Sequence, residues 1–232
     1  MANVMHRQLL TDEAYDRIKR AIITCELAPG QQITEEQLAA SFAVGRAGVR
    51  AALKRLCQEN FVLLASRKRY LVAPVTLKHV NELFELRLML EPPAARRAAG
   101  RLTTDAIERL GRLSDVQYVV GDHDSAARFL QANTEFHATI AASSGNTALA
   151  DVIRSMLDKI ERVHHMAHLL HDRNELSRQE HVDLLEALMA GDGSRAERMM
   201  TEQIQSARAF VIETMVASPR LQSAQVGLER HA

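Results

Sequence analysis

The sequence predicts a mainly α-helical protein, for three reasons. The 232 residues include ten Gly, five Pro and no Trp, and only 4% are aromatic, a composition that favours helix over sheet. Apolar residues recur at helical spacing along most of the chain. Short breaks rich in Gly, Ser, Asn and Asp separate these periodic stretches, as turns do between helices. An all-β fold does not fit this pattern.

The first segment is expected to form three helices. Apolar residues predict a first helix over 15–23, and the Pro-Gly pair at 29–30 ends it. Thr34 stands three residues before Gln37, a capping-box arrangement in which each side chain satisfies a free N–H at the start of the second helix. A third helix over 46–59 has an apolar side and a basic side. Its apolar side consists of Val49, Ala52, Leu53 and Leu56.

Two short β-rich stretches follow, at 61–64 and 70–72, and a basic loop at 65–69 separates them. Their composition predicts a two-stranded hairpin. Pro74 and Thr76 then mark a domain boundary, because Thr76 is placed to cap the next helix.

The rest of the chain shows helical periodicity only. We therefore expect an N-terminal domain over 1–75, an all-helical bundle over 76–217 and a disordered tail over 218–232. Pro92 and Pro93 are expected to kink or interrupt the first bundle helix, because each lacks an N–H and its ring crowds the preceding turn. A bundle of this size can enclose a ligand cavity. The predicted bundle helices span roughly 77–99, 104–119, 125–142, 147–171, 175–190 and 194–216.

The composition also limits the cellular setting. Charged residues make up 25% of the chain and hydrophobic residues 47%, as in ordinary soluble proteins. No apolar stretch approaches the roughly 18 residues that cross a bilayer, and acids interrupt the segment 1–13. Cys25 and Cys57 form no CxxC pair and agree with a reducing compartment. We therefore expect a cytoplasmic protein with no membrane partner.

The net charge of zero conceals a segregation of charge along the chain. Residues 1–75 hold eleven Lys and Arg against seven Asp and Glu, a net charge of +4, and residues 76–232 carry −4. Seven of those bases lie within 46–69, where Glu59 is the only acid. A concentration of positive charge in one segment indicates a nucleic-acid partner.

Three short helices, a hairpin and this basic bias are the parts of a winged helix-turn-helix. Its third helix can enter a DNA major groove, where an arginine that pairs with guanine discriminates by about 1–3 kcal/mol. Bases in the hairpin loop can reach phosphates or the minor groove. The alternative is that 46–69 is only a solvated charged face. The predicted DNA-binding residues are Arg46, Arg50, Lys54 and Arg55 on the helix and Arg67, Lys68 and Arg69 in the loop.

Motifs along most of the chain carry a resemblance to a known family. Residues 15–56 closely resemble the DNA-binding domain of GntR-type bacterial regulators, and the chain after 76 is similar to the all-helical effector domain of the FadR subfamily, called FCD. The motifs of the first domain are Leu27-Ala28-Pro29-Gly30, Thr34-Glu35-Glu36-Gln37-Leu38-Ala39 and Val49-Arg50-Ala51-Ala52-Leu53. Those of the second are Leu83-Phe84-Glu85-Leu86-Arg87 with Glu91, Phe136-His137, Glu180-His181 and Gly191-Asp192.

The resemblance implies a homodimeric transcription factor that binds a short palindromic double-stranded DNA operator. It implies that a small ligand in the helical domain alters the affinity for DNA. Arg46 and Arg50 match the arginines of the family's recognition helix, and Lys54 or Arg55 is the expected contact to the DNA backbone.

The chain departs from the family at two places. The segment 45–48 reads Gly-Arg-Ala-Gly where the family commonly has Ser-Arg-Thr-Pro. The recognition helix therefore lacks an N-cap serine and a proline in its first turn. Arg69 stands where the wing usually turns at a glycine, and arginine does not readily adopt a positive φ.

A possible metal site follows from the resemblance. Many effector domains of the subfamily hold a divalent metal with one Asp and three His, and the matching positions here are Asn133, His137, His181 and Gln203. Two of these four are amides, which bind zinc or nickel poorly. The alternative is that they are surface polar residues or hydrogen-bonded core histidines. A second histidine group shares one helix face, namely His164, His168 and His171. Of these, His164 or His168 could supply a replacement ligand.

The effector site does not require the metal. Asn133, His137, His181 and Gln203 would still present donors and acceptors to a buried polar molecule. Arg87 can pair with a carboxylate of the ligand, or with the chain's own Glu91 on the next helical turn. The resemblance implies small organic acids or related metabolites as effectors.

The leading hypothesis is therefore a ligand-responsive DNA-binding regulator, a repressor as is usual in the family, and not an enzyme. A metal-dependent helical hydrolase using His137 and His181 is one alternative, although the chain has neither an HExxH motif nor a nucleophile elbow. A DNA-binding protein without an effector is another.

Overall fold

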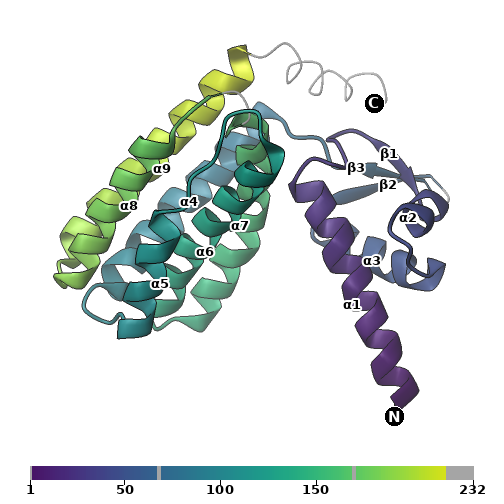
Figure 1. Ribbon diagram of the computed structural model, residues 1–232, viewed down its shortest axis with the longest axis horizontal. Coiled ribbons are helices and arrows are strands. Elements are labelled where there is room, and N and C mark those ends of the chain that lie inside the picture. Colours follow the sequence, from purple (N-terminus) through teal and green to yellow (C-terminus); the bar gives the residue numbers. More distant parts are fainter. Residues whose placement is uncertain (1, 67–68, 169–170, 218–232) are drawn as a thin grey trace. The chain divides into compact units, whose positions relative to one another are not determined.

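The computed structural model describes residues 2–66, 69–168 and 171–217 (Figure 1). The chain is mainly helical, as predicted, and divides into two compact units between Val75 and Thr76. None of the helices in the described part is both long and apolar enough to cross a membrane.

The N-terminal unit combines three helices with an antiparallel sheet in the order β1-β3-β2. The central strand β3 pairs Tyr70 with Ile33 of β1 and Leu71 with Leu63 of β2. The sequence predicted the hairpin but not β1, because three residues are too few to show a strand pattern. The elements are α1 (Ala2–Ile23), β1 (Gln32–Thr34), α2 (Glu35–Ser41), α3 (Arg46–Gln58), β2 (Val62–Ser66) and β3 (Arg69–Val72).

One hydrophobic core holds this unit together. The apolar side of α3 packs on α1, and Ile18, Ile22, Leu53 and Leu56 are completely buried. Full burial of each such side chain contributes about 1.5–3 kcal/mol. Because the core uses one side of α3, the basic side of that helix is left at the surface.

The start of α2 follows the expectation from sequence, whereas α1 begins at Ala2, well before the predicted range 15–23. Gln37 N donates to Thr34 Oγ1 at 3.2 Å, and Thr34 N donates to Gln37 Oε1 at 3.0 Å, so the capping box is present. α3 begins after Gly45 with no side-chain cap. Arg69 begins β3 in ordinary extended backbone. The described non-glycine residues with a positive φ are Cys25, Ala43 and Asn60.

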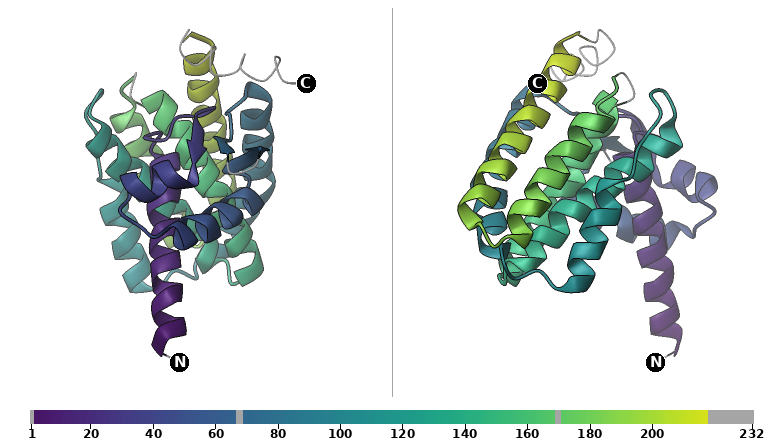
Figure 2. Two further views of the ribbon diagram at one scale, coloured as in Figure 1. Left: turned by 90° about the vertical axis from the view of Figure 1, so that its right-hand side faces the viewer. Right: turned by 60° about the vertical axis from the view of Figure 1, so that its left-hand side comes forward.

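The second unit is a helical bundle whose members lie side by side (Figures 1 and 2). α4 packs most extensively on α9 and also contacts α6 and α7, so it occupies the centre of the bundle. The predicted tail over 218–232 lies outside the described residues. The helices are α4 (Leu77–Ala98), α5 (Thr104–Ser114), α6 (His123–Ser143), α7 (Thr147–His168), α8 (Asn174–Met189) and α9 (Gly193–Ala217).

The predicted interruption of the first bundle helix is wrong. α4 continues through Pro92 and Pro93 to Ala98. Ala94 and Ala95 just beyond the prolines are buried in the bundle, and this packing outweighs the cost of two missing backbone donors.

The second bundle helix is shorter than the predicted range 104–119. α5 ends at Ser114. The backbone N–H and C=O of Tyr118 instead pair with the side chain of Asn174, each at 2.9 Å. A long-range contact of this kind has no signal in local periodicity.

Candidate functional sites

The basic side of α3 is exposed in the N-terminal unit. The side chains of Arg46 and Arg50 are 69% and 64% exposed, and Lys54 is also exposed. Arg46 and Arg50 are four residues apart and so share one helix face. Three of the predicted DNA-binding residues therefore lie on the exposed side of a single helix.

The other predicted DNA-binding residues are placed differently. The guanidinium carbon of Arg55 lies 3.5 Å from the ring centroid of Tyr15, and its Nε donates to Glu59 at 3.2 Å. These contacts hold Arg55 against α1. Arg69 is exposed at the start of β3, whereas the predicted contacts at 67–68 lie outside the described residues.

Two consecutive glutamates at the start of α2 contact the exposed arginines. Arg46 Nη2 donates to Glu36 Oε1 at 2.8 Å. Arg50 donates to the buried Glu35 from Nε at 3.1 Å and from Nη2 at 2.9 Å. Hydrogen bonding to Glu35 raises the pKa of Arg50. The sequence interpretation did not assign a role to either glutamate, although both directly follow the helix-capping Thr34.

A groove of about 590 Å³ lies between α3 and the β2-β3 hairpin. Leu64 on β2 is 66% exposed beside it. Basic groups next to an apolar surface suit a DNA backbone, which offers phosphate charge and sugar carbons together. The lining residues are Ala47, Arg50, Ala51, Lys54, Cys57, Leu64 and Tyr70.

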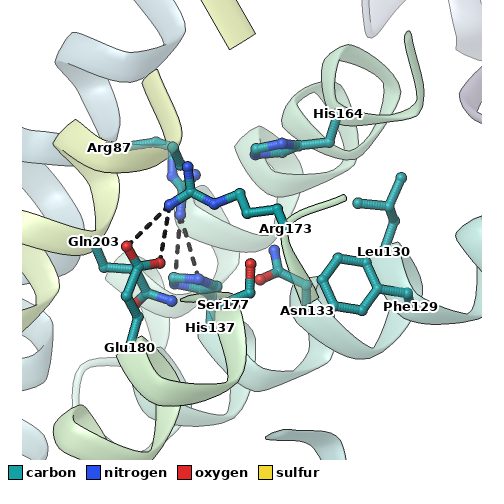
Figure 3. Close-up of a pocket in the computed structure, with 11 residues that line it drawn as sticks. Arg87, Phe129, Leu130, Asn133, His137, His164, Arg173, Ser177, Glu180 and Gln203 are labelled. Atoms are coloured by element: carbon teal, nitrogen blue, oxygen red, sulfur yellow. Dashed lines mark hydrogen bonds and ion pairs between the residues drawn. The ribbon is translucent and has the colours of Figure 1, made fainter. Parts of the chain in front are cut away.

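Polar side chains of the helical unit converge on a small cavity (Figure 3). Four of the five predicted effector residues line it, namely Arg87, Asn133, His137 and Gln203. The cavity measures about 20 Å³, which is room for roughly one water molecule. A metabolite therefore requires the surrounding side chains to move. The remaining lining residues are Phe129, Leu130, His164, Arg173, Ser177, Glu180 and Ala207.

His181, the fifth predicted residue, does not line the cavity. Its ring stacks on Phe136 with centroids 4.0 Å apart and lies 6.0 Å from the ring of His137. Burial, reinforced by the nearby charges of His137 and Arg87, lowers the pKa of His181 well below its ordinary value and keeps the ring neutral. Its Nε2 has no hydrogen-bond partner among the described residues.

Arg87, Glu91 and His137 form a buried charged group beside the cavity. Arg87 Nε donates to Glu91 Oε1 at 2.6 Å, and His137 Nδ1 lies 2.7 Å from Glu91 Oε2. Burial alone would raise the pKa of Glu91, but the charges of Arg87 and His137 outweigh it and lower that pKa to about 2. The carboxylate is therefore ionised at neutral pH, and the alternative pairing of Arg87 with Glu91 is the one that the structure adopts.

A second arginine, which the sequence interpretation missed, faces the same cavity. Arg173 Nη2 donates to Glu180 at 2.9 Å and to Ser206 Oγ at 2.6 Å. Arg173 precedes α8 in a connecting segment, where no helical periodicity indicates which way a side chain points. In Figure 3, dashed lines join its guanidinium to the carboxylate of Glu180.

The donors near the cavity do not fit a zinc or nickel site. No group of three His, Cys, Asp or Glu side chains within the described residues is arranged to hold a metal, and the amides Asn133 and Gln203 are poor ligands for these ions. Of the second histidine group, His164 lines the cavity. His171 is exposed and packs beside Phe210. The side chain of the third member, at 168, lies outside the described residues.

Comparisons with known proteins agree on both units. Residues 10–72 match the family described as bacterial regulatory proteins, gntR family, and residues 82–206 match the FCD domain. The transcriptional repressor RspR of Escherichia coli strain K12 is 24% identical over 198 residues, which are 85% of this chain and 87% of RspR. The transcriptional repressor NanR of Escherichia coli strain K12 / DH10B is 26% identical over 227 residues, with 88% of this chain and 84% of NanR covered.

A solved structure shows the same fold. The structure of E. coli McbR/YncC superimposes with a TM-score of 0.76 at 23% identity, covering 88% of this chain and 97% of McbR/YncC.

A winged helix-turn-helix with an exposed basic helix and a helical domain with a polar cavity together define a ligand-responsive DNA-binding transcriptional regulator. The two family matches establish the same class. This chain belongs to the gntR family of bacterial regulatory proteins and carries an FCD domain. The family and its relatives are regulators rather than enzymes, so the hydrolase alternative finds no support.

Proposed function

We propose that this regulator is a repressor that binds a palindromic DNA operator as a homodimer and releases it when a small carboxylate metabolite binds in the helical unit. The observation that carries the proposal is the pair of arginines, Arg87 and Arg173, on one cavity. Arginine forks match carboxylates through two parallel hydrogen bonds. The names of RspR and NanR as repressors support the sign of regulation.

The effector pocket is proposed to work without a metal. Each arginine is held by its own glutamate, Arg87 by Glu91 and Arg173 by Glu180. A ligand carboxylate would form new hydrogen bonds with an arginine while Asn133 supplies a neutral donor and acceptor. Because the cavity is about 20 Å³, ligand binding must separate the helices or displace a glutamate. This movement is the proposed link to DNA affinity.

On DNA, Arg50 is proposed to read base edges, with Arg46 and Lys54 on the phosphate backbone. A palindrome requires two copies related by a two-fold axis. Exposed apolar side chains on α4 support a surface for the second copy, since Leu86 is 46% exposed and Met89 is 66% exposed. Because the proposed operator is bacterial DNA, the proposed site of action is the cytoplasm.

The test is a thermal-shift screen of the purified chain against mono- and dicarboxylates, followed by DNA binding with each stabilising compound. The proposal expects a compound that raises the melting temperature and weakens DNA binding, with both effects lost in Arg87→Met. Stabilisation that survives in both Arg87→Met and Arg173→Met contradicts the assignment of this cavity. A sedimentation measurement that gives a monomer contradicts the homodimer.

A further inference from the structure

The two glutamates that contact the arginines of α3 are adjacent in sequence but differ in surroundings. The Glu36 side chain is 79% exposed and accepts a hydrogen bond from Arg46 Nη2. Glu35 is only 8% exposed and offers both carboxylate oxygens to Arg50. An exposed pair exchanges readily with water and with DNA phosphates. A buried carboxylate with two-point contact fixes the orientation of its partner.

The atoms involved determine what Arg50 can still do. A guanidinium presents five N–H donors in a rigid plane. Glu35 takes the edge formed by Nε and Nη2 of Arg50. The other edge, formed by Nη1 and the second hydrogen of Nη2, has no hydrogen-bond partner among the described residues. That edge is a two-donor fork of the kind that guanine accepts through O6 and N7.

Three structural elements hold Glu35 in place. The capping box of Thr34 fixes the start of α2, where Glu35 is the first residue. Pairing of β1 with β3 places Ile33 opposite Tyr70, and the Tyr70 hydroxyl lies 3.4 Å from Glu35 Oε1. Glu35 on α2 therefore contacts both Arg50 on the recognition helix α3 and Tyr70 on strand β3 of the wing.

We propose that Glu35 is a positioning residue for sequence specificity, because it holds the guanidinium of Arg50 with its free edge available to a guanine. Glu36 has a different role: it competes with DNA for Arg46 and so lowers affinity for all sequences alike. The inference rests on the proposed role of Arg50 in base reading.

The two positions provide a matched pair of variants. Glu35→Gln and Glu36→Gln each remove one negative charge at neighbouring sites, so their general electrostatic effect on DNA is alike. The probes are the duplex that the wild-type chain enriches from a randomised library and a scrambled duplex of the same composition. Glu36→Gln should raise the affinity for both duplexes by a similar factor. Glu35→Gln should reduce the ratio of the two affinities by about tenfold or more, because guanine discrimination is lost.

The expected mechanism is tested in the Arg50→Ala background. There, Glu35→Gln should cause no further loss of the affinity ratio, since its effect passes through Arg50. A further loss of similar size overturns the proposal, as does a Glu35→Gln ratio equal to that of Glu36→Gln. If Glu35→Gln does not fold, Glu35→Asp replaces it, because aspartate keeps the charge but has a shorter side chain. Glu35→Asp should also lower the affinity ratio. A wild-type affinity ratio in Glu35→Asp overturns the proposal.

The same experiment separates two failures. A wild-type chain that enriches no duplex contradicts base reading by Arg50 itself. In the second case, the wild-type chain prefers the enriched duplex to the scrambled one, Arg50→Ala loses this preference and Glu35→Gln keeps it. That result contradicts only the positioning role of Glu35.

Discussion

The arginine–glutamate pairs at the two candidate sites of this regulator lie in different surroundings. In the N-terminal unit, Arg46 and Arg50 keep more than half of their side-chain surface exposed. In the helical unit, Arg87 and Glu91 are each 2% exposed. An exposed pair contributes about 0–1 kcal/mol because water solvates both partners. Removing one partner of a buried pair costs about 3–5 kcal/mol because the other charge is left uncompensated.

This difference assigns different tasks to the same chemical pair. In the proposed mechanism, Arg46 leaves Glu36 for DNA at little cost, whereas Arg50 keeps its contact with Glu35 while its other edge contacts a base. Arg87 is buried with Glu91, so a ligand that replaces Glu91 must itself supply a negative charge, in agreement with the proposed carboxylate effector.

The largest expected effect is on the buried pair. Glu91→Gln should destabilise the helical unit by about 3–5 kcal/mol, because Arg87 stays buried without a counter-charge. Denaturant unfolding measures this change. The matched control is Glu108→Gln, which breaks an exposed pair with Arg112 at 3.8 Å and should change stability by less than about 0.5 kcal/mol. Equal effects at both positions would remove the distinction between buried and exposed pairs.

The pH dependence of stability sharpens the same distinction. The pKa of Glu91 is lowered from 4.5 to about 2, so its stabilising contribution is complete above pH 4.5 and is lost as the pH falls from about 4.5 to about 2. The contribution is on the order of 3 kcal/mol. The difference in unfolding free energy between the wild type and Glu91→Gln should therefore shrink as the pH falls from about 4.5 to about 2. A difference that does not change with pH contradicts the ionised pair.

The exposed arginines should affect DNA binding rather than stability. Arg50→Ala should cost about 1–3 kcal/mol on the enriched duplex and much less on scrambled DNA. Lys54→Ala should lower the affinity for both duplexes by a similar factor and reduce the magnitude of the slope of log affinity against log salt by about one. Fluorescence anisotropy at several salt concentrations measures both quantities. Equal losses on the two duplexes for Arg50→Ala rule out base reading.

The smallest expected effect concerns metals. Zinc or nickel added at about a hundred times a specific dissociation constant would stabilise the chain by about 2.7 kcal/mol. With amides at Asn133 and Gln203, we expect no change in melting temperature after chelation or metal addition. Stabilisation that disappears in His137→Ala would instead identify a metal site.

The sequence predicted what periodicity and capping chemistry determine. The basic side of α3, the capping box at Thr34 and the bundle helices follow from spacing alone. The continuous path of α4 through Pro92 could not be predicted, because it depends on packing against distant helices.

The sequence predicted some residues of the ligand cavity and missed others. Residues at helical spacing on one face, such as Asn133 and His137, were expected together, and both line the cavity. Arg173 reaches the cavity from a connecting segment, where no sequence periodicity indicates which way a side chain points. His181 was expected to line the cavity, but its ring stacks on Phe136, the residue beside His137. This contact depends on how the helices pack, which the sequence pattern does not show.

In the proposed mechanism, a ligand binds in the helical unit and changes the affinity of the N-terminal unit for DNA. The most direct measurement is the affinity of the wild-type chain for its enriched duplex with and without a carboxylate that stabilises the protein. The carboxylate should weaken DNA binding by about 5- to 150-fold, and DNA should weaken carboxylate binding by the same factor. Arg87→Met should abolish both effects. A carboxylate that binds through Arg87 and leaves the DNA affinity unchanged would show that the two units are not coupled.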